Sequence, residues 1–108
     1  MAKYVLLESR DPFDSGDTLH DYQVASDLAK AGNEVTLFLV QNGVFPARKS
    51  AHSERLSQLA KENVTVLADS FALRERAIAS GELVDGVKAA ELEVVVDAMA
   101  AGHKTIWL

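Results

Sequence analysis

The sequence has no cysteine among its 108 residues. The chain therefore cannot form a disulfide, hold a metal through thiolates or perform thiol or persulfide chemistry on its own side chains. Proline is scarce as well, with two residues, whereas 48% of the residues are hydrophobic and 25% are charged. This balance is typical of a folded globular protein and argues against disorder or a fibrous repeat. We expect one domain over residues 1–108, because two halves would each have too small an interior.

Positive charge is in deficit, since 16 acidic residues stand against 11 basic ones and the net charge is −5. Such a chain presents no broad positive field to phosphates, so we expect no nucleic-acid partner. Long hydrophobic runs are also missing: no apolar stretch approaches the ~20 residues that cross a bilayer. The apolar run near the start is too short for a signal peptide. We therefore expect a cytoplasmic location and no membrane partner.

What the sequence does contain is an alternation of strand-like and helical segments. Short runs of β-branched and aromatic residues predict strands, and apolar residues three or four positions apart predict helices. The expected strands are residues 3–9, 34–40, 64–68, 84–88 and 104–108, and the expected helices are residues 19–31, 53–61, 71–79 and 90–101. The alternation predicts an α/β three-layer sandwich, in which a five-stranded, mainly parallel sheet is flanked by helices.

Two longer connections, residues 10–18 and 42–51, follow the first and second expected strands. In an open parallel sheet, ligands bind at the carboxyl edge of the strands, where these connections begin. We therefore expect a pocket at this edge. Its candidate residues are Asp11, Phe13, Asp14, His20, Asn42, Gly43, Asp69, Ser70 and Arg76.

The first of these connections carries three carboxylates, Asp11, Asp14 and Asp17, at three-residue spacing. A calcium loop places its acids at alternate positions, so we interpret these residues as turn-forming, with Asp17 or Thr18 capping the next helix. Gly16 is the single glycine of the connection, whereas a dinucleotide fingerprint or a P-loop needs several. We expect neither a cofactor nor a metal.

The other reactive side chains form no motif that is specific to one chemistry. His20, His52 and His103 lie in separate elements without paired ligands, which leaves no metal motif. His20, at the start of the first expected helix, is the best acid–base candidate of the three. Ser70 follows Asp69 at a strand-to-helix turn, but it lacks the flanking glycines of a nucleophile elbow. A serine hydrolase is therefore not expected.

Five segments, residues 3–8, 29–35, 37–44, 64–68 and 73–76, carry a resemblance that spans the chain. In their order and spacing they resemble the DsrE/DsrF-like sulfur-relay family, small α/β proteins that include subunits of the Tus and Dsr sulfurtransferase complexes. The resemblance implies a DsrE-like sheet whose topology is related to the flavodoxin and Rossmann folds.

In active members of that family, a cysteine near the start of the helix after the third strand accepts and passes on a persulfide. Alignment on Arg76 places that position at Ala72, which has no nucleophile. The resemblance thus implies a non-catalytic subunit or binding protein of an oligomeric complex, associated with intracellular sulfur transfer but unable to carry persulfide itself.

The same resemblance implies partners, namely further copies of the chain in a trimer or hexamer, or related DsrE-like subunits. Four apolar residues that a monomer of this size would bury with difficulty are compatible with such contacts: Phe13, Val44, Phe45 and Trp107. The alternative is a small-molecule binding protein or an acid–base enzyme that uses the pocket at the carboxyl edge of the sheet.

Overall fold

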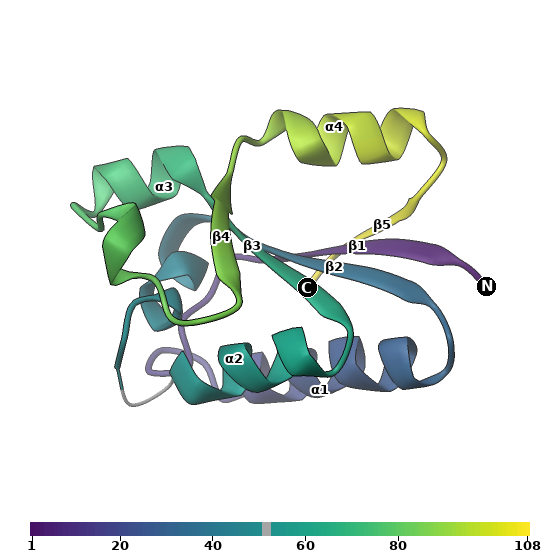
Figure 1. Ribbon diagram of the computed structural model, residues 1–108, viewed down its shortest axis with the longest axis horizontal. Helices are drawn as coiled ribbons and strands as arrows, with labels where there is room; N and C mark the ends of the chain where they lie inside the picture. The colour runs from purple at the N-terminus through teal and green to yellow at the C-terminus, as the bar shows by residue number, and fades with distance from the viewer. Residues whose placement is uncertain (51–52) are drawn as a thin grey trace.

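A five-stranded parallel sheet organises the protein (Figure 1). The computed structural model describes residues 1–50 and 53–108. The strands are β1 (Lys3–Glu8), β2 (Glu34–Leu39), β3 (Val64–Asp69), β4 (Val87–Ala90) and β5 (Lys104–Trp107). Their order across the sheet is β4-β3-β2-β1-β5, and every neighbouring pair is parallel. The chain thus builds the sheet outward from β1 to β4 and then crosses back to add β5 on the other side of β1.

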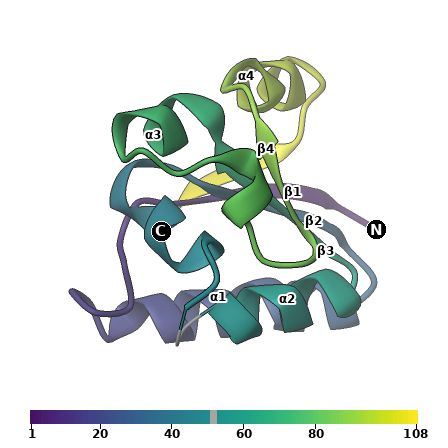
Figure 2. The ribbon, with the colours of Figure 1, turned by 60° about the vertical axis from the view of Figure 1, so that its left-hand side comes forward.

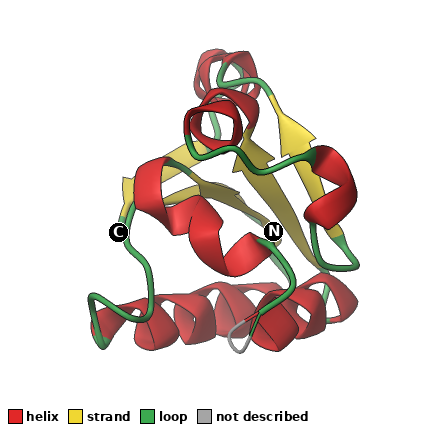
Figure 3. Ribbon diagram, turned by 90° about the vertical axis from the view of Figure 1, so that its left-hand side faces the viewer, coloured by secondary structure: helices red, strands yellow, loops and turns green. Residues whose placement is uncertain are grey.

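Helices cover both faces of this sheet, which confirms the expected three-layer α/β architecture. The helices are α1 (Asp17–Lys30), α2 (Ser53–Lys61), α3 (Ser70–Glu75) and α4 (Glu93–Ala100), with two short 3₁₀ helices, η1 (Gln41–Ala47) and η2 (Ser80–Glu82). Figure 2 shows α1 and α2 side by side beneath the sheet, with α3 and α4 above it. Figure 3, seen from the carboxyl edge of the strands, shows short helical segments between these two layers.

Alternating side chains of the central strands supply the core of each layer, as the pleat requires. Leu6 and Leu37 point to the side of α1 and α2 and pack in one cluster with Tyr22. Phe38 of β2 points to the other side and packs with Val95 of α4. Full burial of each such side chain stabilises the fold by about 1.5–3 kcal/mol.

The layer formed by α4 is thinner than the layer of α1 and α2. Val95 is the one buried residue of α4, and Leu92, Val94, Val96 and Met99 are exposed. We call these four exposed residues the α4 patch. A helix with apolar side chains on its outer face leaves apolar surface in contact with water.

Two expected boundaries around the fourth strand are wrong. This strand was expected at residues 84–88 but occupies Val87–Ala90, because Gly86, with a φ of +90°, still belongs to the preceding turn. The last helix was expected from residue 90 and begins at Glu93, since β4 extends into that segment.

Three further expectations about local structure are also wrong. The helix at 71–79 ends at Glu75, because Ala77 takes a φ of +53°. The connection at 42–51 is mostly the 3₁₀ helix η1, and its residue 51, like His52, lies outside the described residues. Neither Asp17 nor Thr18 caps α1, whose N-cap is Gly16. In the described residues, no helix has the length and apolar character needed to cross a bilayer.

Candidate functional site

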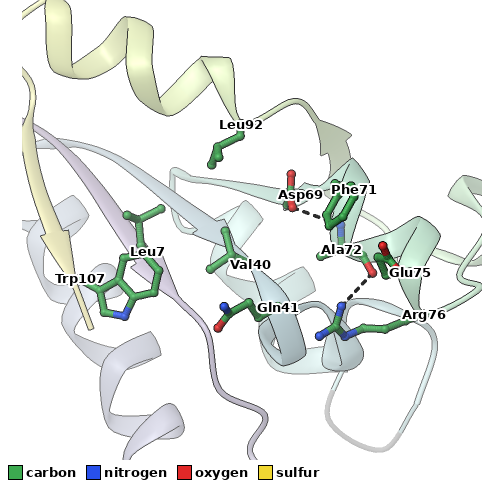
Figure 4. Close-up of a pocket in the computed structure, with 10 residues that line it drawn as sticks. All are labelled: Leu7, Val40, Gln41, Asp69, Phe71, Ala72, Glu75, Arg76, Leu92 and Trp107. Carbon is green, nitrogen blue, oxygen red and sulfur yellow. Dashed lines mark hydrogen bonds between the residues drawn. The ribbon is translucent and has the colours of Figure 1, made fainter.

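A cavity of about 530 Å³ lies at the carboxyl edge of the sheet, on the side of α4 (Figure 4). This volume is in the range of small-molecule sites. The residues that line the cavity are Leu7, Val40, Gln41, Asp69, Phe71, Ala72, Glu75, Arg76, Leu92 and Trp107. Six of these ten residues are apolar, so most of the lining consists of hydrocarbon and aromatic rings.

The sheet topology explains the position of the cavity. The direction in which strands are added reverses at β1, which pairs with β2 on one side and with β5 on the other. Leu7 and Trp107 are partners in the β1–β5 register, so they lie next to each other at the end of these strands. A crevice outside the carboxyl ends at such a reversal is the usual ligand position in open α/β sheets.

The turn from β3 into α3 places Ala72 on the wall of the cavity. The Oδ2 atom of Asp69 accepts a hydrogen bond from the Ala72 backbone N–H at 3.1 Å, and this bond caps α3. The Ala72 residue is 3% exposed. The position therefore offers the cavity a methyl group and no reactive atom.

Arg76 connects α3 to η1 at the polar end of the cavity. Its Nε and Nη2 atoms donate to Oδ1 of Asn42 at 3.2 and 2.9 Å, and its Nη1 donates to the Ala72 carbonyl at 3.2 Å. The guanidinium also lies 5.6 Å from the centre of the Phe45 ring, which Arg48 approaches to 5.1 Å. The Arg76 charge is thus held by protein acceptors and an aromatic ring.

At the same end of the cavity, the first residues of η1 have a constrained backbone. Gln41 has a φ of +51°, a left-handed conformation that is uncommon for a residue with a side chain. Gly43 lies so close to the end of β1 that a Cβ atom there would overlap the carbonyl oxygen of Glu8. A glycine at this position therefore lets η1 pack against β1.

A second polar cluster lies at the end of β1, on the side of α1. Glu8 is 0% exposed, and its Oε1 accepts the Arg10 backbone N–H at 3.2 Å. Arg10 lies with its guanidinium nitrogens 3.8 Å from Glu8 and 3.6 Å from Asp21. Burial, which is the largest cause, and the neighbouring carboxyl of Asp21 raise the pKa of Glu8 to about 8.

Tyr22 adjoins this cluster and is fully buried. Burial raises the pKa of the Tyr22 hydroxyl well above its usual range, and the charges of Glu8, Asp11 and Asp21 act in the same direction.

Comparison with protein families matches residues 2–108 to the DsrE/DsrF-like family. The chain belongs to the DsrE/DsrF-like family. The matched residues span the strands and α-helices described above, and the match agrees with the resemblance carried by the sequence segments.

Solved structures share the fold of this DsrE/DsrF-like chain. The ychN protein from E. coli matches with a TM-score of 0.89 at 21% identity, and each chain is covered completely. MTH1491 from Methanobacterium thermoautotrophicum, a protein of unknown function, matches with a TM-score of 0.86 at 19% identity, again over all of both chains. BT1422 from Bacteroides thetaiotaomicron, a conserved protein of unknown function, matches at 0.78 and 15%, over 98% of this chain and 94% of its own. A comparison with curated proteins gives no match.

The structure of this DsrE/DsrF-like chain separates the candidate residues into two groups. Asp69, Ala72 and Arg76 line the cavity, and Asn42 reaches it through the side chain of Arg76. Gly43 and Ser70 flank the same region without lining it, Gly43 inside η1 and Ser70 as the first residue of α3.

The remaining candidates, in the connection after β1 and the first turns of α1, do not line the cavity. Asp11 accepts the Phe13 backbone N–H through Oδ1, and its carbonyl accepts the Asp14 N–H, which is the turn geometry that we expected. Phe13, Asp14 and His20 are exposed. Within residues 1–50 and 53–108, no group of three or more His, Asp or Glu side chains is suited to holding a metal ion.

Sequence reasoning missed seven of the residues that line the cavity: Leu7, Val40, Gln41, Phe71, Glu75, Leu92 and Trp107. Leu7 and Val40 could have been found, because each stands at or within two residues of the carboxyl end of an expected strand. Leu92 and Trp107 had no such signal, since their position depends on β5 pairing with β1 rather than with β4.

Proposed function

We propose that this DsrE/DsrF-like chain is a non-catalytic, cytoplasmic subunit of an oligomeric complex that is associated with intracellular sulfur transfer but carries no persulfide itself. The observation that carries this proposal is Ala72. It lines the cavity at the start of the helix after β3, where the family resemblance expects the sulfur-accepting cysteine. A methyl group there neither attacks a sulfur donor nor holds a persulfide.

The α4 patch supports the oligomeric part of the proposal. Three of its side chains project from α4, which contributes one residue to the core, and the fourth, Leu92, is the N-cap of that helix, so association would remove apolar surface from water. The proposed partners are further copies of this chain, in a trimer or hexamer, or related DsrE-like subunits. Trp107 is exposed as such contacts require, whereas Val44, which we had included with it, is fully buried in the core.

Light scattering coupled to size-exclusion chromatography, over a wide range of protein concentrations, tests the oligomeric part. We expect the wild type to elute as a trimer or hexamer, and Val96→Glu to elute as a monomer, because a carboxylate in the α4 patch would be desolvated on assembly. Leu19→Glu, at an exposed apolar residue of α1 outside the patch, is the matched control and should leave the mass unchanged. A wild type that stays monomeric at every concentration would refute the proposal.

A second function is supported by the cavity, namely the binding of a small molecule, or acid–base catalysis upon it. The apolar lining together with Asp69, Glu75 and Arg76 gives the mixture of hydrocarbon surface and a few polar groups that such sites have. A thermal-shift screen of metabolites tests this function, because a ligand that binds the native state raises the melting temperature. If no metabolite raises the melting temperature, the proposed role as a subunit of an oligomeric complex is the function that remains.

A further inference from the structure

The cavity also indicates the chemical class of molecule that fits it. We infer that it takes a small organic cation, with an apolar or aromatic body and a protonated amino group. This inference rests on the second function proposed above, and it adds that the cavity prefers positively charged ligands.

The residues that line the cavity favour a ligand with an apolar body. Leu7, Val40 and Leu92 present hydrocarbon to the cavity, and two aromatic side chains, Phe71 and Trp107, line it as well. Phe71 is 59% exposed and Trp107 is 61% exposed, so a ligand between them would remove a large aromatic surface from water. Figure 4 shows Trp107 on one side of the cavity, opposite Phe71 and Ala72, with Leu92 above.

The charge of the ligand follows from which polar groups in the lining already have partners. The Arg76 guanidinium donates to two protein oxygens, on Asn42 and Ala72, and lies against the Phe45 ring. Most of its N–H donors are therefore already used within the protein, and the lining carries two carboxylates, Asp69 and Glu75, against this one guanidinium. An anionic ligand would have to compete with these contacts, and it would lie near two carboxylates of the lining.

The carboxylates of the lining have fewer hydrogen bonds within the protein than Arg76 has. Asp69 is buried, and its hydrogen bond to Ala72 uses Oδ2, which leaves Oδ1 able to accept from a ligand. Glu75 adds a second carboxylate to the same lining. A buried carboxylate with a single backbone donor gains from a charge-assisted hydrogen bond, which an ammonium group supplies. The nearby aromatic rings favour the same charge through their faces.

Trp107 provides the measurement, because it is the single tryptophan of the chain and it lines the cavity. Its fluorescence is followed during titration with three molecules of matched shape: phenethylammonium, the neutral phenethyl alcohol and the anionic hydrocinnamate. We expect phenethylammonium to bind about tenfold more tightly than the alcohol, or about 1.4 kcal/mol, and hydrocinnamate to bind most weakly.

Asp69→Asn assigns that preference to one group, since asparagine caps helices as well as aspartate does but carries no charge. This variant should lose most of the preference for phenethylammonium over the alcohol, with an unchanged melting temperature. Asp97→Asn removes an exposed acid of α4 that does not line the cavity, and it should keep the wild-type preference. Ala72→Leu, which fills the cavity, should weaken binding of all three molecules.

The outcomes separate this inference from the function on which it rests. If all three molecules change the Trp107 fluorescence with equal affinity, or if hydrocinnamate binds most tightly, the cavity binds small molecules but the inference about charge is wrong. If none of them changes the fluorescence or the melting temperature, the inference about an organic cation is wrong, and the metabolite screen decides whether the cavity binds another small molecule. If Asp97→Asn abolishes the preference as Asp69→Asn does, the assignment to Asp69 fails.

Discussion

Single residues determine how closely the elements around the cavity approach each other. At Gly43 the η1 backbone lies against the Glu8 carbonyl, which also accepts the Val40 backbone N–H at 3.0 Å. At Ala72 a small side chain leaves room for the cavity beside the first turn of α3. Both positions were noted in the sequence, Gly43 as a pocket residue and Ala72 as a missing cysteine, but their common role in shaping one region required the structure.

The contact at Gly43 predicts a measurable loss of stability. Gly43→Ala should lower the free energy of unfolding by about 1–3 kcal/mol, because its methyl group would overlap a backbone atom that cannot rotate away. Gly81→Ala is the matched control, since a Cβ atom there meets nothing within 4 Å, and its effect should stay within about 0.5 kcal/mol. Urea denaturation measures both values. Equal effects of the two substitutions would contradict the argument.

At the scale of elements, buried carboxyl groups lie at the junction of β1 and α1. The Glu8 side chain, at the end of β1, lies near Asp21 of α1, and the guanidinium of Arg10, from the intervening connection, lies 3.8 and 3.6 Å from these two carboxyls. Asp11 belongs to the same connection, and Asp17, the first residue of α1, lies 3.7 Å from Arg10. Loss of the Glu8 proton would leave a buried carboxylate next to Asp21, with one half-exposed guanidinium beside them.

This junction predicts that stability depends on pH. The unfolded chain releases the Glu8 proton near the ordinary pKa of 4.5, whereas the folded protein holds it up to a pKa of about 8. Between these values the folded state binds more protons, so the contribution of Glu8 to stability falls as the pH rises from about 4.5 to about 8. Glu8→Gln, which is neutral at every pH, should flatten this part of the profile and raise the melting temperature at alkaline pH.

The control for the pH prediction is Glu34→Gln, at an exposed carboxylate that pairs with Lys3 on the surface. It should keep the wild-type profile, because an exposed pair contributes little. Melting temperatures measured by circular dichroism across this pH range decide the matter. A Glu8→Gln profile that parallels the wild type would exclude Glu8 as the origin of the dependence.

At the scale of the whole molecule, the two helical layers differ in what they bury. The layer of α1 and α2 covers a large core cluster, whereas α4 packs through Val95 against a smaller one. If the α4 patch is an interface, α4 gains much of its protection from the assembled state rather than from its own fold. Assembly into the proposed oligomer would therefore stabilise α4 within each chain.

Amide hydrogen exchange tests this link. We expect the backbone amides of α4 to exchange slowly in the assembled wild type and markedly faster in the monomeric Val96→Glu variant. The amides of the central strands β1 and β2 should change little, because their core does not depend on α4 alone. Uniform loss of protection over the whole chain would instead mean that the variant is globally destabilised.

Local patterns in the sequence predicted most of the fold, because strand and helix periodicities and breakers such as Gly32 act over a few residues. They failed at residues 84–92, where the apolar Val84 resembles the start of a strand. In the structure its backbone N–H donates to Ala47 of η1 instead, so a tertiary contact determines where β4 begins. They also failed at the start of α1, where the Ser15 hydroxyl accepts from the Asp17 backbone N–H.

The sequence by itself determined the alternating α/β order, the lack of any sulfur nucleophile and the strand-to-helix turn at Asp69 and Ser70. Each of these depends on residue identity or on neighbours within a few positions. Only the tertiary structure decided which side chains share the cavity, and it brought Trp107 and Leu92 to Ala72 while leaving Asp11 and His20 outside. The physical reason is the order of the strands, since β5 satisfies its backbone hydrogen bonds by pairing with β1, and no local pattern records that choice.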